Sequence, residues 1–418
     1  MKAGRIFAAT ATAGMLATGA AACASSGSGG STGAAPATGP VTIGESTTLS
    51  GSIAELGQSG LQGVQLAAAN LNSHGGVLGR KVKVISADDA ATPATGAANV
   101  RSMILNDHAV AIFGPVSSAV AAAEEPLAAQ YQIPVFFHTS NDISLLGKLF
   151  TRYAFQVVPN TVMESRAAAD YLAKQSAGKR ITVATFAPDY SFGHDTVSGF
   201  LQALKDLHVS YKLVAQEFPP LGATSIASYL SRIVTAKPEY LFNAQFGGDL
   251  VTFTRQAAGY GLFSKTKVIA MYDSPVLASL GGSAPAGAIG FDRLPFWAVP
   301  GLASFSRQFH SKYGAWPSEW AVLGYTAVQT WAYGVTHAHS FSGGKVAAAL
   351  AGATVPTIRG TITIRSCDHQ AEVPEYVGTV ASAADTTYHQ VLWNPSSMFT
   401  APFSAIDLSC AQVQAMRG

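Results

Sequence analysis

Residues Ala109-Val-Ala-Ile-Phe-Gly-Pro-Val-Ser-Ser118 give the clearest indication of the fold class of this chain. Its first five residues are a short, continuous apolar run typical of a buried strand, and the Gly-Pro pair then marks a turn. We predict a helix after Ser118, and a second apolar run, Ile133-Pro-Val-Phe-Phe137, predicts the next strand. Buried strands separated by a helix indicate a parallel sheet of the α/β class.

The same alternation extends toward the N-terminus. Residues 41–43 and 82–85 predict strands, and helices are predicted over 57–72 and 93–106, where apolar residues recur at helical spacing. A Gly-rich turn, His74-Gly-Gly-Val-Leu-Gly-Arg80, precedes the second of these strands. The βαβαβ order therefore predicts a parallel sheet with helices on both of its faces.

The alternation of strands and helices begins again after Pro159. The chain of 418 residues is long enough for two or three domains. Two such units predict two similar Rossmann-like lobes, although no sequence motif is repeated between them. Beyond residue 302 the chain is richer in helix, and its C-terminal part has only weak periodicity. The expected elements after Pro159 are strands at 180–186, 240–243, 268–271 and 361–364, and helices at 193–207, 250–260 and 320–335.

The N-terminus predicts export. Lys2 and Arg5 precede an apolar, Ala-rich segment, and residues 1–22 are typical of a secretory signal peptide. The segment ends in Ala20-Ala-Ala-Cys23, which resembles a bacterial lipobox, although Ala20 stands where Leu is usual. We therefore predict a lipidated Cys23 and localisation at the outer face of the cell membrane. The alternative is an ordinary signal sequence followed by an incidental cysteine.

Residues 23–40 are rich in Ser, Gly, Thr, Ala and Pro, a composition that cannot form a core and is typical of a flexible tether. The whole chain has 26 basic and 24 acidic residues, and removal of Lys2 and Arg5 leaves the two counts equal. This balance argues against a nucleic-acid partner.

Two cysteines remain besides Cys23. In an oxidising, exported setting a disulfide between Cys367 and Cys410 is the default expectation. The alternative is a pair of buried free thiols, which are too few and too far apart to predict a metal site.

No catalytic motif stands out. Residues 114–118 lack the glycine that a nucleophile elbow requires two positions after the serine. There is no phosphate-binding Gly-Lys-Ser/Thr loop, and His337-Ala-His339 is too slight for a metal site. We expect no enzyme activity, no cofactor and no metal.

Polar residues instead follow predicted strands, where open α/β sheets bind their ligands. Hydroxyls and helix N-terminal amides can hold a carboxylate, and an aspartate can hold an ammonium group. Each residue could alternatively cap a helix. The residues are Ser117 and Ser118, residues 138–142, Asp189 and Tyr190, and Asp273 and Ser274.

Several stretches together resemble the leucine/isoleucine/valine-binding family, the type I periplasmic binding proteins of ABC importers, from about residue 41 to residue 388. Each stretch is weak alone, and their order and spacing carry the resemblance. They are Ile43-Gly-Glu-Ser-Thr-Thr-Leu-Ser-Gly51, Asn72-Ser-His-Gly-Gly-Val-Leu-Gly-Arg80, Asp88-Asp89, Gly114-Pro-Val-Ser-Ser118, Asp189-Tyr-Ser-Phe-Gly193, Arg255-Gln-Ala-Ala-Gly-Tyr-Gly-Leu262, Gly324-Tyr-Thr-Ala-Val328 and Cys367-Asp-His-Gln370.

The resemblance implies a ligand site. The family's carboxylate-binding serine falls on Ser118, beside Ser117, and the contacts of the next loop fall on Thr139 and Asn141, where Thr is more usual than Asn. The ammonium-binding carboxylate falls on Asp273. Pocket aromatics of the family fall on Leu56 and Phe192, both departures, with Tyr190 as a possible substitute for a tyrosine at 192, and near Phe246.

The resemblance also implies how the protein works. A branched-chain amino acid, or a related amide or carboxylate, is expected to bind between the lobes and to close them about a hinge. The partners are then this small molecule and an ABC permease, with the protein a monomer. A sensory binding protein that reports to a membrane receptor is the alternative function.

Three crossovers between the lobes are implied, near 157–158, 288–289 and 369–370. The N-terminal lobe is accordingly expected at 41–157 plus 289–369, and the C-terminal lobe at 158–288 plus 370–418.

Overall fold

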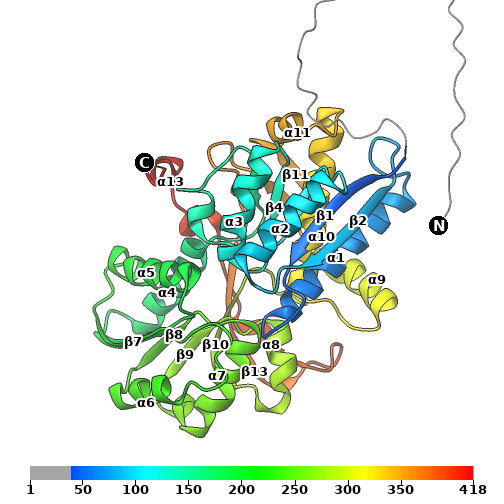
Figure 1. Cartoon of the computed structure of the whole chain (residues 1–418). Helices are drawn as coiled ribbons and strands as arrows, with labels where there is room; N and C mark the ends of the chain where they lie inside the picture. The colour runs from blue at the N-terminus through cyan, green and yellow to red at the C-terminus, as the bar shows by residue number, and fades with distance from the viewer. Residues whose placement is uncertain (1–38, 418) are drawn as a thin grey trace, which may run out of the picture. The chain divides into compact units, whose positions relative to one another are not determined.

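The computed structural model describes residues 39–417. The expected signal peptide (1–22), the lipidated Cys23 and nearly all of the tether lie outside the described residues. Within residues 39–417 the chain alternates strands and helices and forms two large sheets (Figure 1), with a small two-stranded sheet of β11 (Thr354–Thr357) and β12 (Gly360–Thr363).

The first sheet has five strands in the order β2-β1-β3-β4-β5, and all of its pairings are parallel. It contains the apolar runs quoted above, which are typical of strands covered on both faces. Its strands are β1 (Val41–Thr47), β2 (Val82–Asp88), β3 (Ile112–Phe113), β4 (Val135–Phe137) and β5 (Ala154–Gln156). The helices of this lobe are α1 (Ala54–Ser73), α2 (Pro93–Leu105), α3 (Ser118–Gln130), α9 (Ala303–Tyr313), α10 (Glu319–Ala338) and α11 (Gly343–Leu350).

The second sheet has eight strands, in the order β14-β13-β10-β9-β8-β6-β7 with β15 paired to β13. The pairings among β6–β10 are parallel, whereas β13 pairs antiparallel with β10, β14 and β15. The strands are β6 (Ile181–Phe186), β7 (Tyr211–Glu217), β8 (Tyr240–Asn243), β9 (Lys267–Ala270), β10 (Ile289–Asp292), β13 (Glu375–Ala384), β14 (Val391–Trp393) and β15 (Phe399–Ala401). The main helices are α4 (Thr161–Ser176), α5 (Ser191–Asp206), α6 (Ala227–Ala236), α7 (Gly247–Gly259) and α8 (Ser274–Leu280).

Three connections join the two lobes, as the fold class predicts. The first follows β5, the second follows β10, and the third precedes β13. The first and third lie side by side, since Ala371 N donates to Gln156 O over 2.9 Å and Gln156 N donates to His369 O over 3.2 Å.

The second crossover, expected at 288–289, was placed too early. β10 pairs with β9 and β13, so the chain leaves the second sheet only after Asp292. The reason is that a buried apolar strand such as Ile289–Asp292 carries no signal for which of two sheets it joins.

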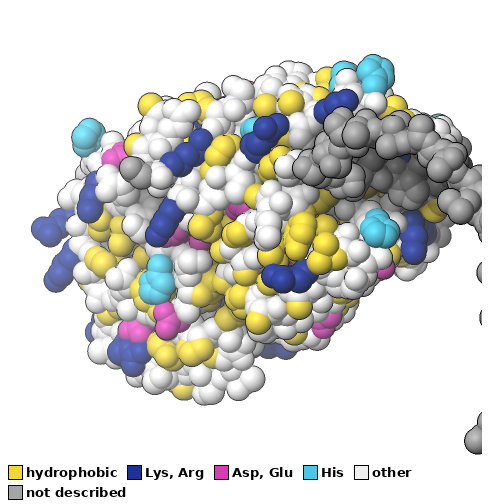
Figure 2. Space-filling view, turned by 45° about the horizontal axis from the view of Figure 1, so that its top comes forward, with side chains coloured by type: hydrophobic (Ala, Val, Ile, Leu, Met, Phe, Trp, Pro, Cys, Tyr) yellow, Lys and Arg dark blue, Asp and Glu magenta, His cyan; other side chains and the backbone are white. Residues whose placement is uncertain are grey.

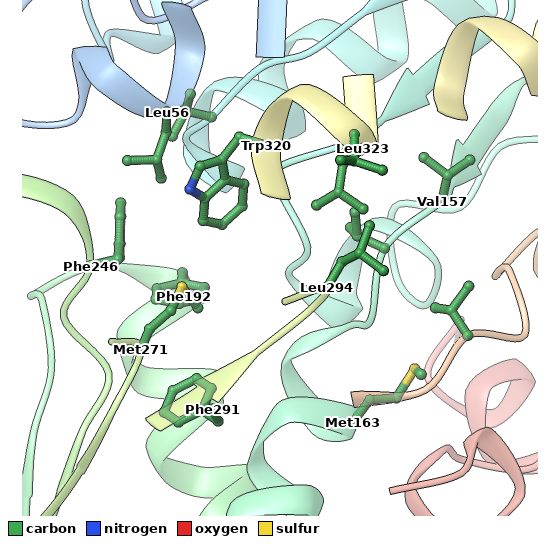
Figure 3. Close-up of a cluster of buried hydrophobic side chains, with 14 of the residues drawn as sticks. Leu56, Val157, Met163, Phe192, Phe246, Met271, Phe291, Leu294, Trp320 and Leu323 are labelled. Carbon is green, nitrogen blue, oxygen red and sulfur yellow. The ribbon is translucent and has the colours of Figure 1, made fainter. Parts of the chain in front are cut away.

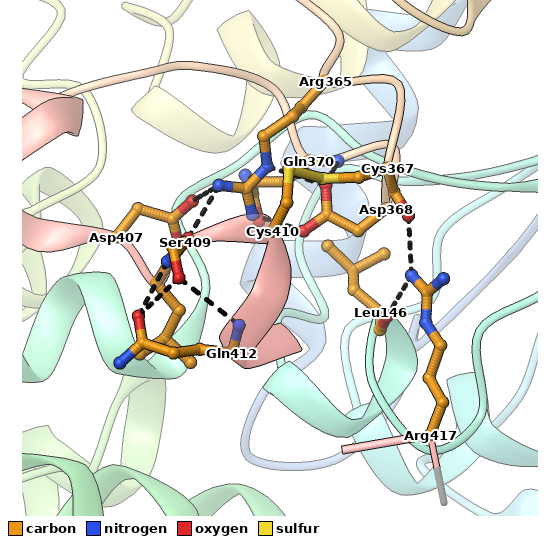
Figure 4. Close-up of a disulfide and its surroundings, with 11 residues drawn as sticks. Leu146, Arg365, Cys367, Asp368, Gln370, Asp407, Ser409, Cys410, Gln412 and Arg417 are labelled. Carbon is orange, nitrogen blue, oxygen red and sulfur yellow. Dashed lines mark hydrogen bonds and ion pairs between the residues drawn. A yellow bond between two sulfur atoms is a disulfide. The ribbon is translucent and has the colours of Figure 1, made fainter. Parts of the chain in front are cut away.

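The Cys367–Cys410 disulfide is present, with 5.9 Å between the two Cα atoms (Figure 4). It ties helix α13 (Cys410–Ala415) to the third connection. Arg365 reinforces this attachment, because its guanidinium pairs with Asp368 and, over 2.7 Å, with Asp407. Arg417 donates to the carbonyl oxygens of Cys367 and Leu146.

Among residues 39–417 no helix is long and apolar enough to cross a membrane. On the face drawn in Figure 2, the Lys and Arg side chains are dispersed among hydrophobic and uncharged ones.

A candidate ligand cavity between the lobes

A small, partly open cavity lies between the lobes, and about 260 Å³ there is not filled by protein atoms, the solvent at its mouth included. Figure 3 shows Leu56 and Trp320 on one side of it, with Phe246, Phe192 and Met271 opposite. The first lobe contributes through α1, the α3 N-terminus, the loop after β4 and α10. The second lobe contributes through the N-terminal ends of α5 and α7 and the segments after β9 and β10. The lining residues are Leu56, Val116, Ser118, Thr139, Asn141, Tyr190, Phe192, Phe246, Met271, Arg293 and Trp320.

The structure brings together most of the residues that the family resemblance implied. Leu56, Ser118, Thr139, Asn141, Tyr190, Phe192 and Phe246 all line the cavity. Ser117 and Asp273 do not, although both are buried. Ser117 occupies the N-cap position of α3, directly before Ser118.

Ser118 is prepared to donate a hydrogen bond. Its Oγ atom accepts from the backbone N–H groups of Asn141 and Asp142, over 3.2 and 3.3 Å. A hydroxyl that accepts twice still has its own proton to give. Ser118 is also the first residue of α3, where backbone N–H groups favour a negative charge. This corner of the cavity is therefore suited to a carboxylate.

Asp273 lies behind the cavity wall, on the far side of the Trp320 side chain. Its Oδ1 accepts from Val276 N over 2.9 Å, which caps α8, and its Oδ2 accepts from Trp320 Nε1 over 3.1 Å. Burial raises the pKa of this carboxyl well above its usual value, and the nearby Asp292 and Glu55 act in the same direction. Trp320 thus separates Asp273 from the cavity.

Arg293 is a charged cavity-lining residue that the sequence analysis missed. It directly follows β10, so the rule that singled out polar residues after other strands could have found it had that strand been identified. Its Nε donates to Glu164 Oε1 over 2.5 Å and its Nη1 donates to Thr139 O. A guanidinium has five N–H donors, so donors remain for a ligand.

Glu164, on α4, is the buried counter-ion of Arg293. Burial raises the pKa of Glu164, while the Arg293 charge and hydrogen bond oppose that rise. Because Arg293 is itself only 3% exposed, its charge is poorly hydrated and interacts strongly with whatever enters the cavity.

Aromatic rings form the rest of the wall. Tyr190 stacks on Phe192 with ring centres 5.8 Å apart, and Phe192 meets Phe246 edge-on at 5.4 Å. The Arg293 guanidinium lies 5.0 Å from the Trp320 ring centre. Flat walls with a cation at one end favour a planar, anionic molecule.

A buried hydrogen-bonded chain supports the loop after β4. His138 Nε2 lies 3.0 Å from Glu45 Oε1, and His138 Nδ1 lies 2.9 Å from the Thr139 hydroxyl. Glu45 and His138 are both fully buried, so this chain fixes Thr139 beside the cavity.

Several bonds join the lobes next to the cavity. Gly248 N of α7 donates to Ser52 O over 2.9 Å, and Ser274 Oγ donates to Glu319 Oε2 of α10 over 2.7 Å. With the Trp320–Asp273 bond, they hold the two lobes together around the lining residues. No cluster of metal-ligating side chains occurs in the part of the chain that the structure describes.

Two α/β lobes with three connections and a cavity between them define a type I solute-binding protein. Residues 40–385 match the sequence profile of the periplasmic binding protein family, and the chain belongs to this family. The expected relationship to leucine/isoleucine/valine-binding proteins is confirmed. The protein is thus an extracytoplasmic solute-binding protein and not an enzyme.

Individual relatives are distant. Leu/Ile/Val-binding protein homolog 4 of Brucella abortus is 24% identical over 364 residues, covering 82% of this chain and 85% of that protein. The crystal structure of a periplasmic binding protein from Burkholderia mallei has a TM-score of 0.81 at 22% identity, covering 88% of this chain and 96% of the other. A solute-binding protein of an ABC transporter from Rhodopseudomonas palustris, crystallised with 3,4-dihydroxybenzoic acid, has a TM-score of 0.76 at 23% identity, covering 87% and 98%.

Proposed function

We propose that this protein is the receptor of an ABC importer and binds a small carboxylate with a flat apolar body between its lobes. The observation that carries the proposal is Arg293, a buried guanidinium in the cavity wall beside the Ser118 hydroxyl and several aromatic rings. An arginine fork suits a carboxylate, which it can bind through two parallel hydrogen bonds.

The relatives support this ligand class without fixing it. The R. palustris protein holds an aromatic acid, and the name of the B. abortus relative refers to branched-chain amino acids. Both kinds of solute carry a carboxylate. Because Asp273 has the place of the family's ammonium-binding acid, branched-chain amino acids remain the second candidate ligand. The Trp320–Asp273 bond favours a carboxylate without an ammonium group.

Hinge closure is the proposed mechanism. A ligand that touches Ser118 of the first lobe and Phe192 or Arg293 of the second favours the closed arrangement through contacts that the open one lacks. We further propose that Cys23 carries the lipid anchor, that the closed monomer docks on a permease, and that the lobes meet along the crossovers described above. A sensory role would use the same closure and a different membrane partner.

A thermal-shift screen tests the proposed ligand class. Aromatic acids, aliphatic acids, amino acids, amides and urea are each added to the purified protein, and a specific ligand raises the melting temperature by mass action. Aromatic and short aliphatic acids are expected to give the largest shifts. Shifts confined to urea or amides would contradict the proposal.

Ser118→Ala is expected to weaken carboxylate binding by about 1–3 kcal/mol, because the ligand oxygen loses a donor in a buried site. Calorimetry with a ligand from the screen measures the loss. Ser117→Ala is the matched control, since Ser117 is a buried neighbour that does not line the cavity. Equal affinities of the two variants would remove Ser118 from the site.

Acid pH is expected to favour the closed form. Asp195 of α5 faces Asp142 of the first lobe, and burial, then the hydrogen bond and charge of Asp142, raise the Asp195 pKa to about 8. A raised pKa means that Asp195 takes up a proton on closing, so its contribution is complete below about pH 4 and is lost as the pH rises through about 8.

Affinity measured from pH 5.5 to 9 checks this expectation, with Asp195→Asn as the comparison. The wild-type protein should lose affinity more steeply than the variant, because all other titrating groups are common to both. If the affinities of the wild type and of Asp195→Asn change with pH in the same way, protonation of Asp195 is not coupled to closure of the lobes.

A further inference from the structure

The cavity wall contains a positive charge and no negative one. Among its eleven lining residues Arg293 is the only ionised side chain, and none is Asp or Glu. Asp273, the acid that the family resemblance places at the ammonium position, is fully buried. A ligand ammonium group in this cavity would thus meet the Arg293 cation and no carboxylate in the wall, since Glu164 is already paired with Arg293.

The Trp320 side chain creates this situation. Its indole lines the cavity on one side, and its Nε1 donates to Asp273 Oδ2 over 3.1 Å on the other. The other carboxyl oxygen of Asp273 is bound to Val276 N, so both oxygens already have donors. Trp320 therefore covers Asp273 and also replaces the donor that an ammonium group would supply.

Further contacts keep Trp320 in this position. Its neighbour Glu319 accepts from both the N–H and the hydroxyl of Ser274, over 3.0 and 2.7 Å, next to Asp273. On the ring face, the Arg293 guanidinium stacks at 5.0 Å. Trp320 is only 1% exposed, so the ring has little freedom to move aside.

We propose that Trp320 is the specificity-determining residue of this cavity, which excludes α-amino acids by covering Asp273 and admits carboxylates that lack the α-ammonium group. This inference rests on the proposed function, because it presupposes that the cavity binds carboxylates. It predicts a gain of function: removing the indole exposes a carboxyl group to the ligand.

The surroundings of Asp273 explain why exposing this carboxyl group should strengthen binding of a ligand with an ammonium group. Burial disfavours its ionisation most, and the nearby Asp292 and Glu55 act in the same direction. A ligand ammonium would offset this repulsion by supplying a positive charge and hydrogen bonds. Space vacated by the indole would let it approach.

The test uses two ligands that differ only in the α-ammonium group, 3-phenylpropanoate and L-phenylalanine. Calorimetry is carried out on the wild type, Trp320→Ala, Trp320→Phe and Trp320→Ala/Asp273→Asn. The wild type should prefer phenylpropanoate by at least 10-fold. Trp320→Ala should reduce or reverse this preference by at least 10-fold, Trp320→Phe should keep it because the ring still covers Asp273, and the double variant should lose the gain.

Each outcome decides the inference. Wild-type protein that binds phenylalanine as well as phenylpropanoate overturns it, as does a Trp320→Ala variant whose preference is unchanged. Binding of phenylpropanoate by Trp320→Ala shows that this variant is folded, and Trp320→Leu takes its place if it is not. If Trp320→Ala and Trp320→Leu have the circular dichroism spectrum of the folded protein but bind neither ligand, Trp320 is required for binding itself. It does not then select between ligands, and the inference is wrong. Wild-type protein that binds no carboxylate overturns the proposed function itself, which is a distinguishable result.

Discussion

Arg293→Met is expected to weaken binding of a carboxylate ligand by about 2–5 kcal/mol, the usual cost of truncating one partner of a buried, hydrogen-bonded charge pair. The guanidinium is 3% exposed and lines the cavity, so no water replaces its contact with the ligand. Calorimetry with an acid from the thermal-shift screen measures the loss.

Folding of this variant should be affected less than binding. Arg293 is paired with Glu164, and burial already raises the pKa of that carboxyl, so Glu164 can become neutral when its partner is removed. Arg293→Met/Glu164→Gln removes the pair altogether and should recover stability without recovering affinity.

Arg359→Met is the matched control. Arg359 donates weakly to the carbonyl oxygen of Arg293, over 3.4 Å, and does not line the cavity. This variant should change stability and leave affinity within about threefold. If Arg293→Met binds as tightly as Arg359→Met, the carboxylate is held elsewhere.

Cys367→Ser is expected to lower the free energy of unfolding by about 4 kcal/mol. The two cysteines are 43 positions apart in the sequence, and the loop-closure model gives a stabilisation of that size. Chemical denaturation of the wild type and of the variant measures the difference. Affinity should change little, since neither cysteine lines the cavity.

Two controls accompany this experiment. Ser366→Ala alters an exposed neighbour of Cys367 and should be neutral. Reduction of the wild type with dithiothreitol should reproduce the Cys367→Ser result. An unchanged denaturation midpoint after reduction would mean that the bond contributes nothing to the stability of the third connection.

The central parallel strands of the first sheet could be predicted because they are apolar on both faces. Residues 109–113 and 133–137 have no polar position, and such runs are typical of strands buried under helices on both sides. β7 was not singled out, since it lies at the edge of the second sheet and exposes Lys212 and Leu213. The antiparallel β13 was also missed, as a C-terminal strand beyond a weakly periodic stretch.

The site residues that could be predicted are those that directly follow a recognisable strand, where open α/β sheets bind their ligands. Ser118, Thr139 and Tyr190 follow strands that the sequence marks clearly, and they line the cavity. Arg293 follows β10, a strand that the sequence analysis did not identify. The placement of Asp273 behind Trp320 depends on a contact between residues 47 positions apart on different lobes. A local pattern carries no information about such a contact.

The most direct measurement of the central claim compares benzoate with benzamide by calorimetry on the wild-type protein. The two molecules have nearly the same shape, and only benzoate offers a negative charge to Arg293. Benzoate is expected to bind at one site per chain and at least about 30-fold more tightly than benzamide, a difference of about 2 kcal/mol. Equal affinities, or binding of benzamide alone, would contradict a cavity built for carboxylates.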